Sequence, residues 1–341
     1  MRPSQRLLAE MRAQADIERL ADDDPGLAEG MAALAAAVRE RGRVRLTGMG
    51  ASLHAAHVLV PLLRQQGIDA DAAVTSDLLH YGPERWDEPL IAISQSGASA
   101  EIEALLQRTD RLPRLWGITL DPDSPLGRAR SLVVPGGPER AYAASRSFTG
   151  TLDVLLRLDA TLRGDERHLR AGHQALAALV KGVPEIGEPI ADALGGAGML
   201  VCTARGALTG VAEYAALLLM ELRRRPAMAL EAAQLRHGPL EAVDPQVGLV
   251  VLRAESPTTE LVDRLIRDAA ARGGPIVVVD AGPDGGPSGD TVHTVRLGEL
   301  SEASAALAAP ALLQPAAMIL ARRAGLEPGQ ALHSSKVTRE Q

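Results

Sequence analysis

Short apolar segments alternate along the chain with longer segments in which apolar residues recur every three or four positions. The short segments, such as "PLIAI" and "SLVV", resemble buried strands of a parallel sheet, and the longer ones have the period of amphipathic helices. Strands that alternate with helices build a parallel sheet covered on both faces. The pattern therefore predicts an α/β fold.

In the first half of the chain the pattern predicts five strands, a set of helices and a domain boundary. The strands are 43–50, 71–76, 89–96, 114–121 and 131–137. The helices are 4–21, 28–41, 52–66, 76–81, 99–107, 125–129 and 146–163. The charged, glycine-bearing segment "RGDERH" (163–168) is expected to mark the boundary, because few contacts cross such segments.

The second half repeats this arrangement. "GMLVCTARG" corresponds to "VRLTGMGAS", "VGLVVLRAESP" to "PLIAISQSGAS" and "GPIVVVDAGPDG" to "LWGITLDPDS". Gly50 precedes Ser96 by 46 residues, and Gly206 precedes Arg253 by 47, which favours a duplicated domain. The second copy lacks the serine cluster of the first, so we expect one phosphate site per chain.

Composition narrows the classes of partner and compartment. The net charge is −7 and basic residues form no long run, so neither nucleic acid nor an anionic membrane is an expected partner. Cys202 is the only cysteine, which excludes an internal disulfide framework and favours a reducing cytoplasm. The charged N-terminus does not resemble a signal peptide. No apolar run approaches 18 residues, so no membrane span is expected.

A polar cluster follows the predicted strand 89–96: Ser94, Gln95, Ser96, Gly97 and Ser99. Open α/β sheets bind ligands where a strand ends and a helix begins, because the helix start offers unpaired N–H groups. Neutral donors and a glycine suit a phosphate that is held but not transferred, since transfer would call for a lysine and magnesium ligands. The alternative is that Ser94 and Ser99 only cap the next helix.

Other candidate residues give weaker signals. The turn "GMGAS" (48–52) ends the first strand and places Ser52 at another helix start, but such glycine turns are common. The histidines show no H-E-x-x-H or other metal-binding spacing, so neither a metal nor a cofactor is expected. His54 and His57 are interpreted as structural or surface residues. Cys202 lies in an apolar strand and is interpreted as a core residue.

Five motifs in this order resemble the double sugar-isomerase (SIS) domain proteins: "GMGAS", "ISQSGAS", "MEL", "QLRHGPL" and "SSKVT". The resemblance extends to the isomerase half of glucosamine-6-phosphate synthase and to stand-alone glucosamine-6-phosphate deaminases and fructosamine-6-phosphate deglycases. It implies two tandem SIS domains, each a doubly wound, mostly parallel five-stranded sheet of flavodoxin-like type in an αβα sandwich. We expect these domains at 1–165 and 166–325, with a tail at 326–341 that closes the active site.

The resemblance also implies residue roles. Residues that would bind the sugar phosphate are Gly50, Ser52, Ser94, Gln95, Ser96, Ser99, Ala143 and Ala144. Glu221 would be the carboxylate base, His237 the ring-opening histidine and Lys336 the lysine of the tail. The segment "GPERAYAASRSFT" (137–149) resembles the family's linker and would bring Glu139 and Arg146 near the site. A homodimer in which His237 serves the neighbouring subunit's site is also implied.

The chemistry is consistent with these roles. Interconverting a ketose phosphate and an aldose or amino-aldose phosphate moves a proton between C1 and C2, which one carboxylate can do. Opening the sugar ring needs a group that titrates near neutrality, which suits histidine, and a lysine can form a Schiff base with a carbonyl. Taken alone, Glu221 could instead be a solvated helix end, and His237 could simply terminate a segment.

The leading hypothesis is a phosphosugar isomerase that acts on an amino- or ketohexose 6-phosphate. The "SGAS" sequence, where the synthase has "SGET", is closer to the deaminase-like members, and no glutaminase domain is expected. The alternatives are a fructosamine-6-phosphate deglycase and a non-catalytic sugar-phosphate sensor. Sensors of this type carry a helix-turn-helix region, for which the residues before "RVRLTG" are too few and too acidic.

Overall fold

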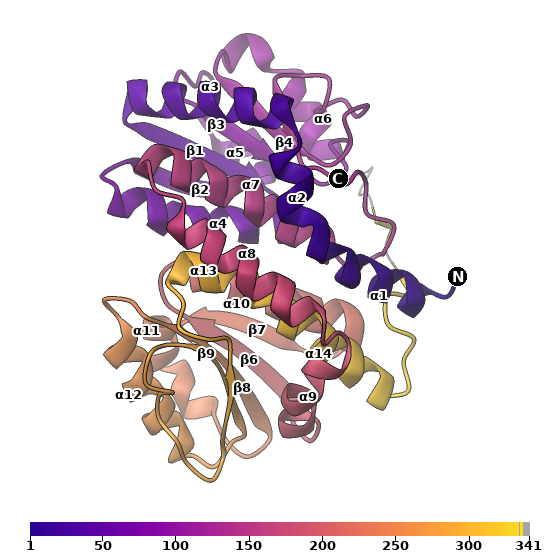
Figure 1. Cartoon of the computed structure of the whole chain (residues 1–341), viewed down its shortest axis with the longest axis vertical. Helices are drawn as coiled ribbons and strands as arrows, with labels where there is room; N and C mark the ends of the chain where they lie inside the picture. The colour runs from indigo at the N-terminus through magenta and orange to yellow at the C-terminus, as the bar shows by residue number, and fades with distance from the viewer. Residues whose placement is uncertain (334, 337–341) are drawn as a thin grey trace. The chain divides into compact units, whose positions relative to one another are not determined.

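The computed structural model describes residues 1–333, 335 and 336, which form two compact units (Figure 1). The N unit comprises Ala13–Glu166 and the described residues from Ala331 onward, and the C unit comprises Met1–Arg12 and Arg167–Gln330. The units differ from the predicted domain limits in the first twelve residues and in the tail. Ser334 and 337–341 of the predicted tail lie outside the described residues.

The N unit is built on a five-stranded, fully parallel sheet. Its strands are β1 (Arg43–Gly48), β2 (Asp69–Val74), β3 (Leu90–Ile93), β4 (Leu115–Thr119) and β5 (Ser131–Val133). Their order is β2-β1-β3-β4-β5, the flavodoxin-like order of doubly wound sheets. The predicted fold class is therefore confirmed, and all five predicted strands are present. Gly48 at the end of β1 pairs with Ile93 at the end of β3, so the turns after these strands are neighbours.

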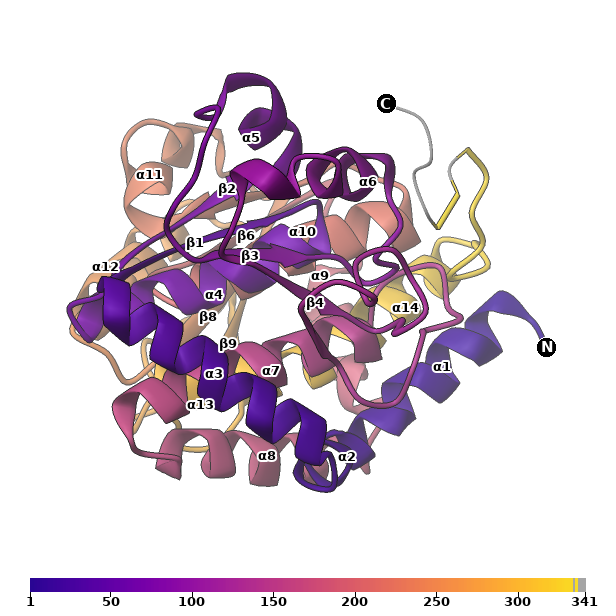
Figure 2. The same cartoon turned by 90° about the horizontal axis from the view of Figure 1, so that it is seen from above.

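Helices cover both faces of this sheet (Figure 2). One face carries α3 (Pro25–Arg41), α4 (Ala51–Gln65) and α7 (Arg146–Arg163), and α7 contacts both α3 and α4. The other carries α5 (Thr75–Tyr81) and α6 (Ala100–Leu106), whose leucines pack with Leu90 and Ala92 of β3. The unit also contains η1 (Gln14–Asp16), α2 (Ile17–Asp22) and η2 (Thr109–Arg111). The burial of apolar side chains from both layers forms the core.

The C unit repeats the same strand order. Its strands are β6 (Met199–Ala204), β7 (Ala227–Glu231), β8 (Val247–Ala254), β9 (Ile276–Ala281) and β10 (Val292–Arg296). The order β10-β9-β8-β6-β7 equals that of the N unit when each sheet is numbered from its own first strand. The apolar pattern did not single out β7 and β10. Both are edge strands, and only Ala227 among their residues is buried, so they carry little apolar signal.

Helices also cover both faces of the C-unit sheet. The helices α8 (Arg167–Val180), α9 (Glu188–Leu194), α10 (Leu208–Arg223), α13 (Glu302–Ala308) and α14 (Pro310–Arg323) pack on one face. The other face carries α11 (Ala232–Arg236) and α12 (Thr259–Ala270) over an aliphatic cluster. The unit further includes α1 (Pro3–Ala13), η3 (Glu185–Gly187) and η4 (Pro239–Ala242). Glu302–Arg323 is long and apolar enough to span a membrane by length and composition alone, but its apolar window is fully buried, as in a core helix.

Two predicted helices differ from the structure. The predicted helix 4–21 is interrupted, because α1 ends at Ala13 and a 3-10 turn precedes α2. The predicted helix 125–129 is wrong, since that segment forms turns. Ser124 Oγ accepts the N–H of Gly127 at 3.0 Å, and a Cβ on Gly127 would lie 2.3 Å from the Asp121 carbonyl oxygen. This close packing against the preceding loop favours the turn.

Candidate functional site

Two polar turns of the N unit lie side by side at the carboxyl ends of β1 and β3. Gly50 precedes α4 with φ 51°, a backbone conformation that favours glycine, and Ser52 lies half-buried in the first turn of α4. The second turn contains Ser94, which is buried, and the half-buried Gln95. The predicted members of the phosphate site from these two turns therefore meet at one edge of the sheet, where open α/β sheets bind ligands.

The serines of the second turn are held by the backbone. Ser94 Oγ accepts the N–H of Gly97 at 3.2 Å, Ser96 Oγ accepts that of Ala98 at 3.4 Å, and Ser99 Oγ accepts that of Ile102 at 3.4 Å. Ser99 thus caps α6, as the alternative interpretation holds. A hydroxyl that accepts a hydrogen bond still has its own proton to donate. Capping and ligand binding are therefore compatible.

Gly97 is required by the shape of this turn. Its φ is +60°, and a Cβ at this position would lie 2.0 Å from Ser124 Oγ and 2.8 Å from Thr119 Oγ1. Ser124 is itself held by a hydrogen bond to the Asp121 carbonyl oxygen at 2.7 Å. The loop after β4 therefore packs against the turn after β3. A side chain at Gly97 would displace the neighbouring serines.

The carboxylate of Glu139 connects the linker to this turn. It is 4% exposed and accepts hydrogen bonds from the backbone N–H groups of Ser145, at 3.0 Å, and Arg146, at 3.1 Å. The hydroxyls of Ser145 and Ser147 also donate to it. The side-chain amide of Gln95 donates at 3.5 Å. One buried anion thus fixes the start of α7 and orients Gln95.

The remaining N-unit residues lie around the same linker. Lys336 donates a hydrogen bond to the Ala141 carbonyl oxygen, and its Nζ lies 3.9 Å from Glu139 Oε2. Arg146 is buried and donates to the Gly137 carbonyl oxygen at 3.1 Å. Ala143 is fully buried and Ala144 is half-buried. The structure therefore places the tail lysine beside the linker that holds Gln95.

The other two predicted catalytic residues belong to the C unit. Glu221 lies half-buried near the end of α10, and His237 is exposed at the end of α11. The predicted site residues therefore divide between the two units.

In the C unit, the carboxylate of Glu302 lies beside the turns after β6 and β8, which correspond to the turns after β1 and β3 in the N unit. The backbone N–H of Ala207, after β6, and the hydroxyl of Ser256, after β8, donate to Glu302. Glu302 is 9% exposed, and its Oε1 lies 2.5 Å from the position that a Cβ on Gly206 would take. Burial raises the pKa of Glu302, and the two hydrogen bonds partly offset this. The C unit thus places a glutamate beside the turns that correspond to the Gly50 turn and the turn after β3 in the N unit.

A buried arginine is a second feature that distinguishes the C unit from the N unit. Arg253, near the end of β8, donates to Asp263 at 2.6 Å, to Asp280 at 2.9 Å and to Asp284 at 2.7 Å. Burial would lower the pKa of Arg253, but the bonds to three carboxylates raise it overall. A buried cation is tolerated only when it is paired in this way. Sequence reasoning missed this cluster, although "VVLRAE" and "VVVDAG" place charged residues directly after apolar strands.

Cys202 is buried in β6, as expected for a core residue. Burial raises the pKa of its thiol to about 12, because the thiolate would be desolvated. A thiol in this state is not a nucleophile at neutral pH.

Comparison with known proteins relates this geometry to sugar-phosphate enzymes. Residues 194–321 match the family model described as SIS domain. The chain is 30% identical over 279 residues to the glutamine–fructose-6-phosphate aminotransferase (isomerizing) of Aeropyrum pernix, covering 76% of this chain and 45% of the relative. It is 28% identical over 257 residues to the enzyme of the same name from Escherichia coli K12, covering 69% of this chain and 41% of the relative. The chain thus spans less than half the length of these relatives.

Solved structures share the fold over almost the whole chain. The C-terminal domain of glucosamine-fructose-6-phosphate aminotransferase from Francisella tularensis has a TM-score of 0.81 at 18% identity, covering 96% of this chain and 98% of that domain. Tagatose-6-phosphate ketose/aldose isomerase from Escherichia coli has a TM-score of 0.81 at 21% identity, covering 95% of each chain. Glucosamine-6-phosphate deaminase from Thermotoga maritima has a TM-score of 0.73 at 19% identity, covering 98% of this chain and 100% of the deaminase chain. The chain therefore contains a SIS domain over residues 194–321 and is homologous to the isomerase half of the glutamine–fructose-6-phosphate aminotransferases.

Proposed function

We propose that this protein is a phosphosugar isomerase that acts on an amino- or ketohexose 6-phosphate, with glucosamine-6-phosphate deaminase-like activity. The observation that carries the proposal is the turn after β3. It presents the hydroxyls of Ser94, Ser96 and Ser99 at the carboxyl edge of the sheet, next to the Gly50 turn. The similarity to proteins named as sugar-phosphate aminotransferases, isomerases and deaminases supports the same substrate class.

The phosphate is proposed to bind to the two turns through neutral donors. Backbone N–H groups and hydroxyls can satisfy a phosphate dianion, and the positive ends of the helix dipoles favour its charge. Gln95, held by Glu139, would donate its remaining amide proton to a neighbouring oxygen of the ligand. These donors are neutral, so they would hold the phosphate without activating its ester bond. The phosphate therefore serves as a handle while chemistry occurs at C1 and C2.

The proton transfer is proposed to involve the three residues predicted as catalytic. Glu221 would move a proton between C1 and C2 through an enediol or enolamine, His237 would open the sugar ring, and Lys336 would act on the carbonyl group or its oxyanion. For an amino sugar, shifting the C2 proton generates an imine that water hydrolyses to release ammonia. We further propose that the protein is a cytoplasmic homodimer with His237 acting in the partner's site.

Product analysis with a substrate panel tests this proposal. Purified protein is incubated with glucosamine 6-phosphate, fructose 6-phosphate, tagatose 6-phosphate and fructosamine 6-phosphates, and ketose, ammonia and amino-acid release are measured. Deaminase-like activity predicts ammonia and fructose 6-phosphate from glucosamine 6-phosphate. Amino-acid release from a fructosamine phosphate would instead identify a deglycase. Tight binding without any turnover would identify a sensor and overturn the enzymatic proposal.

A single substitution tests the role of Glu221. Glu221→Gln keeps the shape of the side chain but removes the base, so turnover should fall about 10²–10⁴-fold while binding is largely kept. Exchange of the substrate C2 proton with deuterated solvent should be lost as well. Glu241→Gln is the matched control, because Glu241 is an exposed glutamate of the same unit. Full C2 exchange in Glu221→Gln would show that another group moves the proton.

A further inference from the structure

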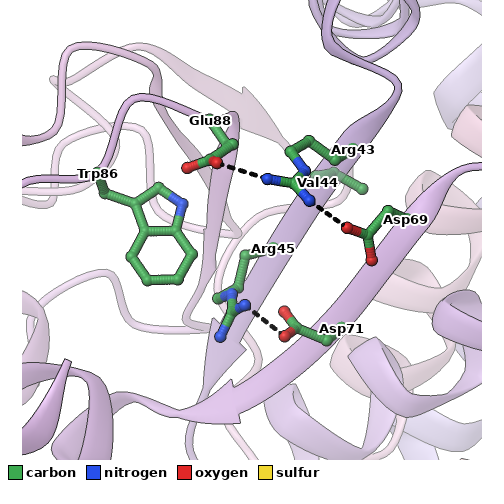
Figure 3. A pocket seen from close by; sticks show the side chains of 7 residues that line it. All are labelled: Arg43, Val44, Arg45, Asp69, Asp71, Trp86 and Glu88. Carbon is green, nitrogen blue, oxygen red and sulfur yellow. Dashed lines mark hydrogen bonds and ion pairs between the residues drawn. The ribbon is translucent and has the colours of Figure 1, made fainter. Parts of the chain in front are cut away.

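A pocket lies in the N unit, away from the turns described above (Figure 3). It contains about 310 Å³ of space, including its open mouth. Its lining residues are Arg43, Val44, Arg45, Asp69, Asp71, Trp86 and Glu88. Arg43 and Asp69 begin β1 and β2, so the pocket is at the amino end of these strands. The turns of the candidate site are at the opposite, carboxyl end of the same parallel sheet.

Three polar atoms of this pocket have unmet hydrogen-bonding capacity. Among the described residues, six buried side-chain polar atoms lack a hydrogen-bond partner, and three of them belong to residues that line this pocket. They are Arg45 Nε and Trp86 Nε1, which are donors, and Asp71 Oδ1, which is an acceptor. A buried polar atom without a partner costs about 1–3 kcal/mol. These three atoms therefore concentrate unmet hydrogen-bonding capacity in the lining of one pocket.

The charges of the pocket alternate in sign. Arg43 pairs with Asp69 at 2.6 Å and with Glu88 at 3.0 Å, and Arg45 pairs with Asp71 at 2.5 Å (Figure 3). Two guanidinium groups therefore face three carboxylates. Such a lining favours neither a simple anion nor a simple cation. Each carboxylate already faces a guanidinium, which also disfavours a metal ion.

Arg45 and Asp71 form the centre of the pocket. The guanidinium of Arg45 lies 4.2 Å from the ring centroid of Trp86, so the ring holds it in place by a cation–π contact. Burial raises the pKa of Asp71, and the neighbouring Asp69 adds to this effect, although Arg45, Arg64 and Arg43 act to lower it. A further positive group beside Asp71 would stabilise its ionised form.

We propose that this pocket binds a small zwitterion, an α-amino acid. The ligand carboxylate accepts hydrogen bonds from Arg45 Nε and Trp86 Nε1, and the ligand ammonium donates to Asp71 Oδ1. An isolated carboxylate leaves Asp71 without its partner, and an isolated amine leaves both donors unpaired. The amino-acid side chain extends toward the open mouth of the pocket. Binding is separate from the proposed isomerase site and does not depend on its assignment.

Intrinsic fluorescence offers a direct test. The chain has two tryptophans, and Trp116 is buried in β4 with Arg130 3.6 Å from its ring centroid. A Trp116→Phe protein keeps Trp86 as its only reporter. It is titrated with glycine, serine and glutamine, and with acetate and methylammonium as probes that carry one charge each. Equilibrium dialysis with the same radiolabelled compounds gives a second, independent reading.

We expect at least one amino acid to saturate one site per chain and to bind at least ten-fold more tightly than acetate or methylammonium. Asp71→Asn removes the charge that holds the ammonium, and Trp86→Phe removes one donor but keeps a ring beside Arg45. Each should weaken binding about ten-fold or more in dialysis, because a charge-assisted hydrogen bond is lost. Two variants are used so that the test can still be made if one of them does not fold.

Matched controls come from the same loop. Arg85 and Asp87 form an exposed pair at 2.9 Å that does not line the pocket, so Arg85→Met and Asp87→Asn should leave binding unchanged. The proposal is overturned if none of the amino acids binds at millimolar concentration in dialysis. It is equally overturned if acetate alone binds as tightly as the amino acids, or if folded Asp71→Asn and Trp86→Phe proteins bind like wild type.

Discussion

Gln95, in the turn after β3, donates its side-chain amide to Oε2 of Glu139 at 3.5 Å. Glu139 is held by the backbone and hydroxyl groups at the start of α7, so this contact couples the turn to the linker. Glu139 thus orients Gln95, a residue of the proposed phosphate site. The same carboxylate lies near Lys336, which brings the tail into the same cluster.

Glu139→Gln tests this coupling. The substitution places an amide NH₂ against several N–H and O–H donors, so at least one loses its acceptor. We expect the free energy of unfolding to fall by about 1–3 kcal/mol, measured in urea. A positioning role predicts in addition a rise in KM for the sugar phosphate at temperatures where the variant is folded. Glu103→Gln, on the exposed face of α6, is the control. Unchanged stability and KM would contradict the coupling.

The serines of the turn are tested by a double substitution. Ser94→Ala with Ser96→Ala removes two hydroxyl donors, each worth about 1.5–3 kcal/mol when it binds a charged group. We expect sugar-phosphate affinity, measured by calorimetry, to fall at least ten-fold. Ser288→Ala, in an exposed loop of the C unit, is the control. Equal turnover of the unphosphorylated sugar and its phosphate ester in wild type would refute the phosphate assignment.

Glu302 makes stability depend on pH in a defined direction. Burial raises its pKa above the usual 4.5, so ionisation costs more in the folded than in the unfolded chain. Its favourable contribution is present below about pH 4.5 and is lost as pH rises through the raised pKa. Glu302→Gln should therefore gain stability relative to wild type between pH 4 and pH 7, as measured by urea unfolding at both values. Glu260→Gln, on the exposed side of α12, should show no comparable gain.

Cys202 should be inert in the folded protein. Its thiol is buried and its pKa is raised to about 12, so neither access nor the thiolate form is available at pH 7–8. Labelling with iodoacetamide should be undetectable by mass spectrometry in native buffer and complete in urea. Rapid labelling under native conditions would show that β6 opens readily.

Complementation tests the proposed dimer. Glu221→Gln and His237→Ala proteins, each nearly inactive, are dissociated and mixed equally. If His237 serves the partner's site, a mixed dimer contains one site with both defects and one with neither. Random pairing makes about half the dimers mixed, so activity should recover to roughly a quarter of wild type. If mixed dimers form and activity does not recover, His237 acts within its own chain.

The sequence by itself determined the elements and the location of the main polar turn. Apolar period and segment length are local properties, so β1, β2, β3, β4, β5, β6, β8 and β9 could be predicted from them. The turn 94–99 was recognised because polar residues directly follow a buried strand. The local pattern failed where burial is slight, as at β7 and β10.

Tertiary structure alone decided which distant residues meet. Glu302 reaches the turn at Ala207 only because α13 packs beside that end of the sheet, and Arg45 meets Asp71 only through the parallel register of β1 and β2. These pairs are far apart along the chain, and no local period encodes their pairing. Burial then sets their energetics, because the cost of an unpaired charge depends on the solvent that the whole fold excludes.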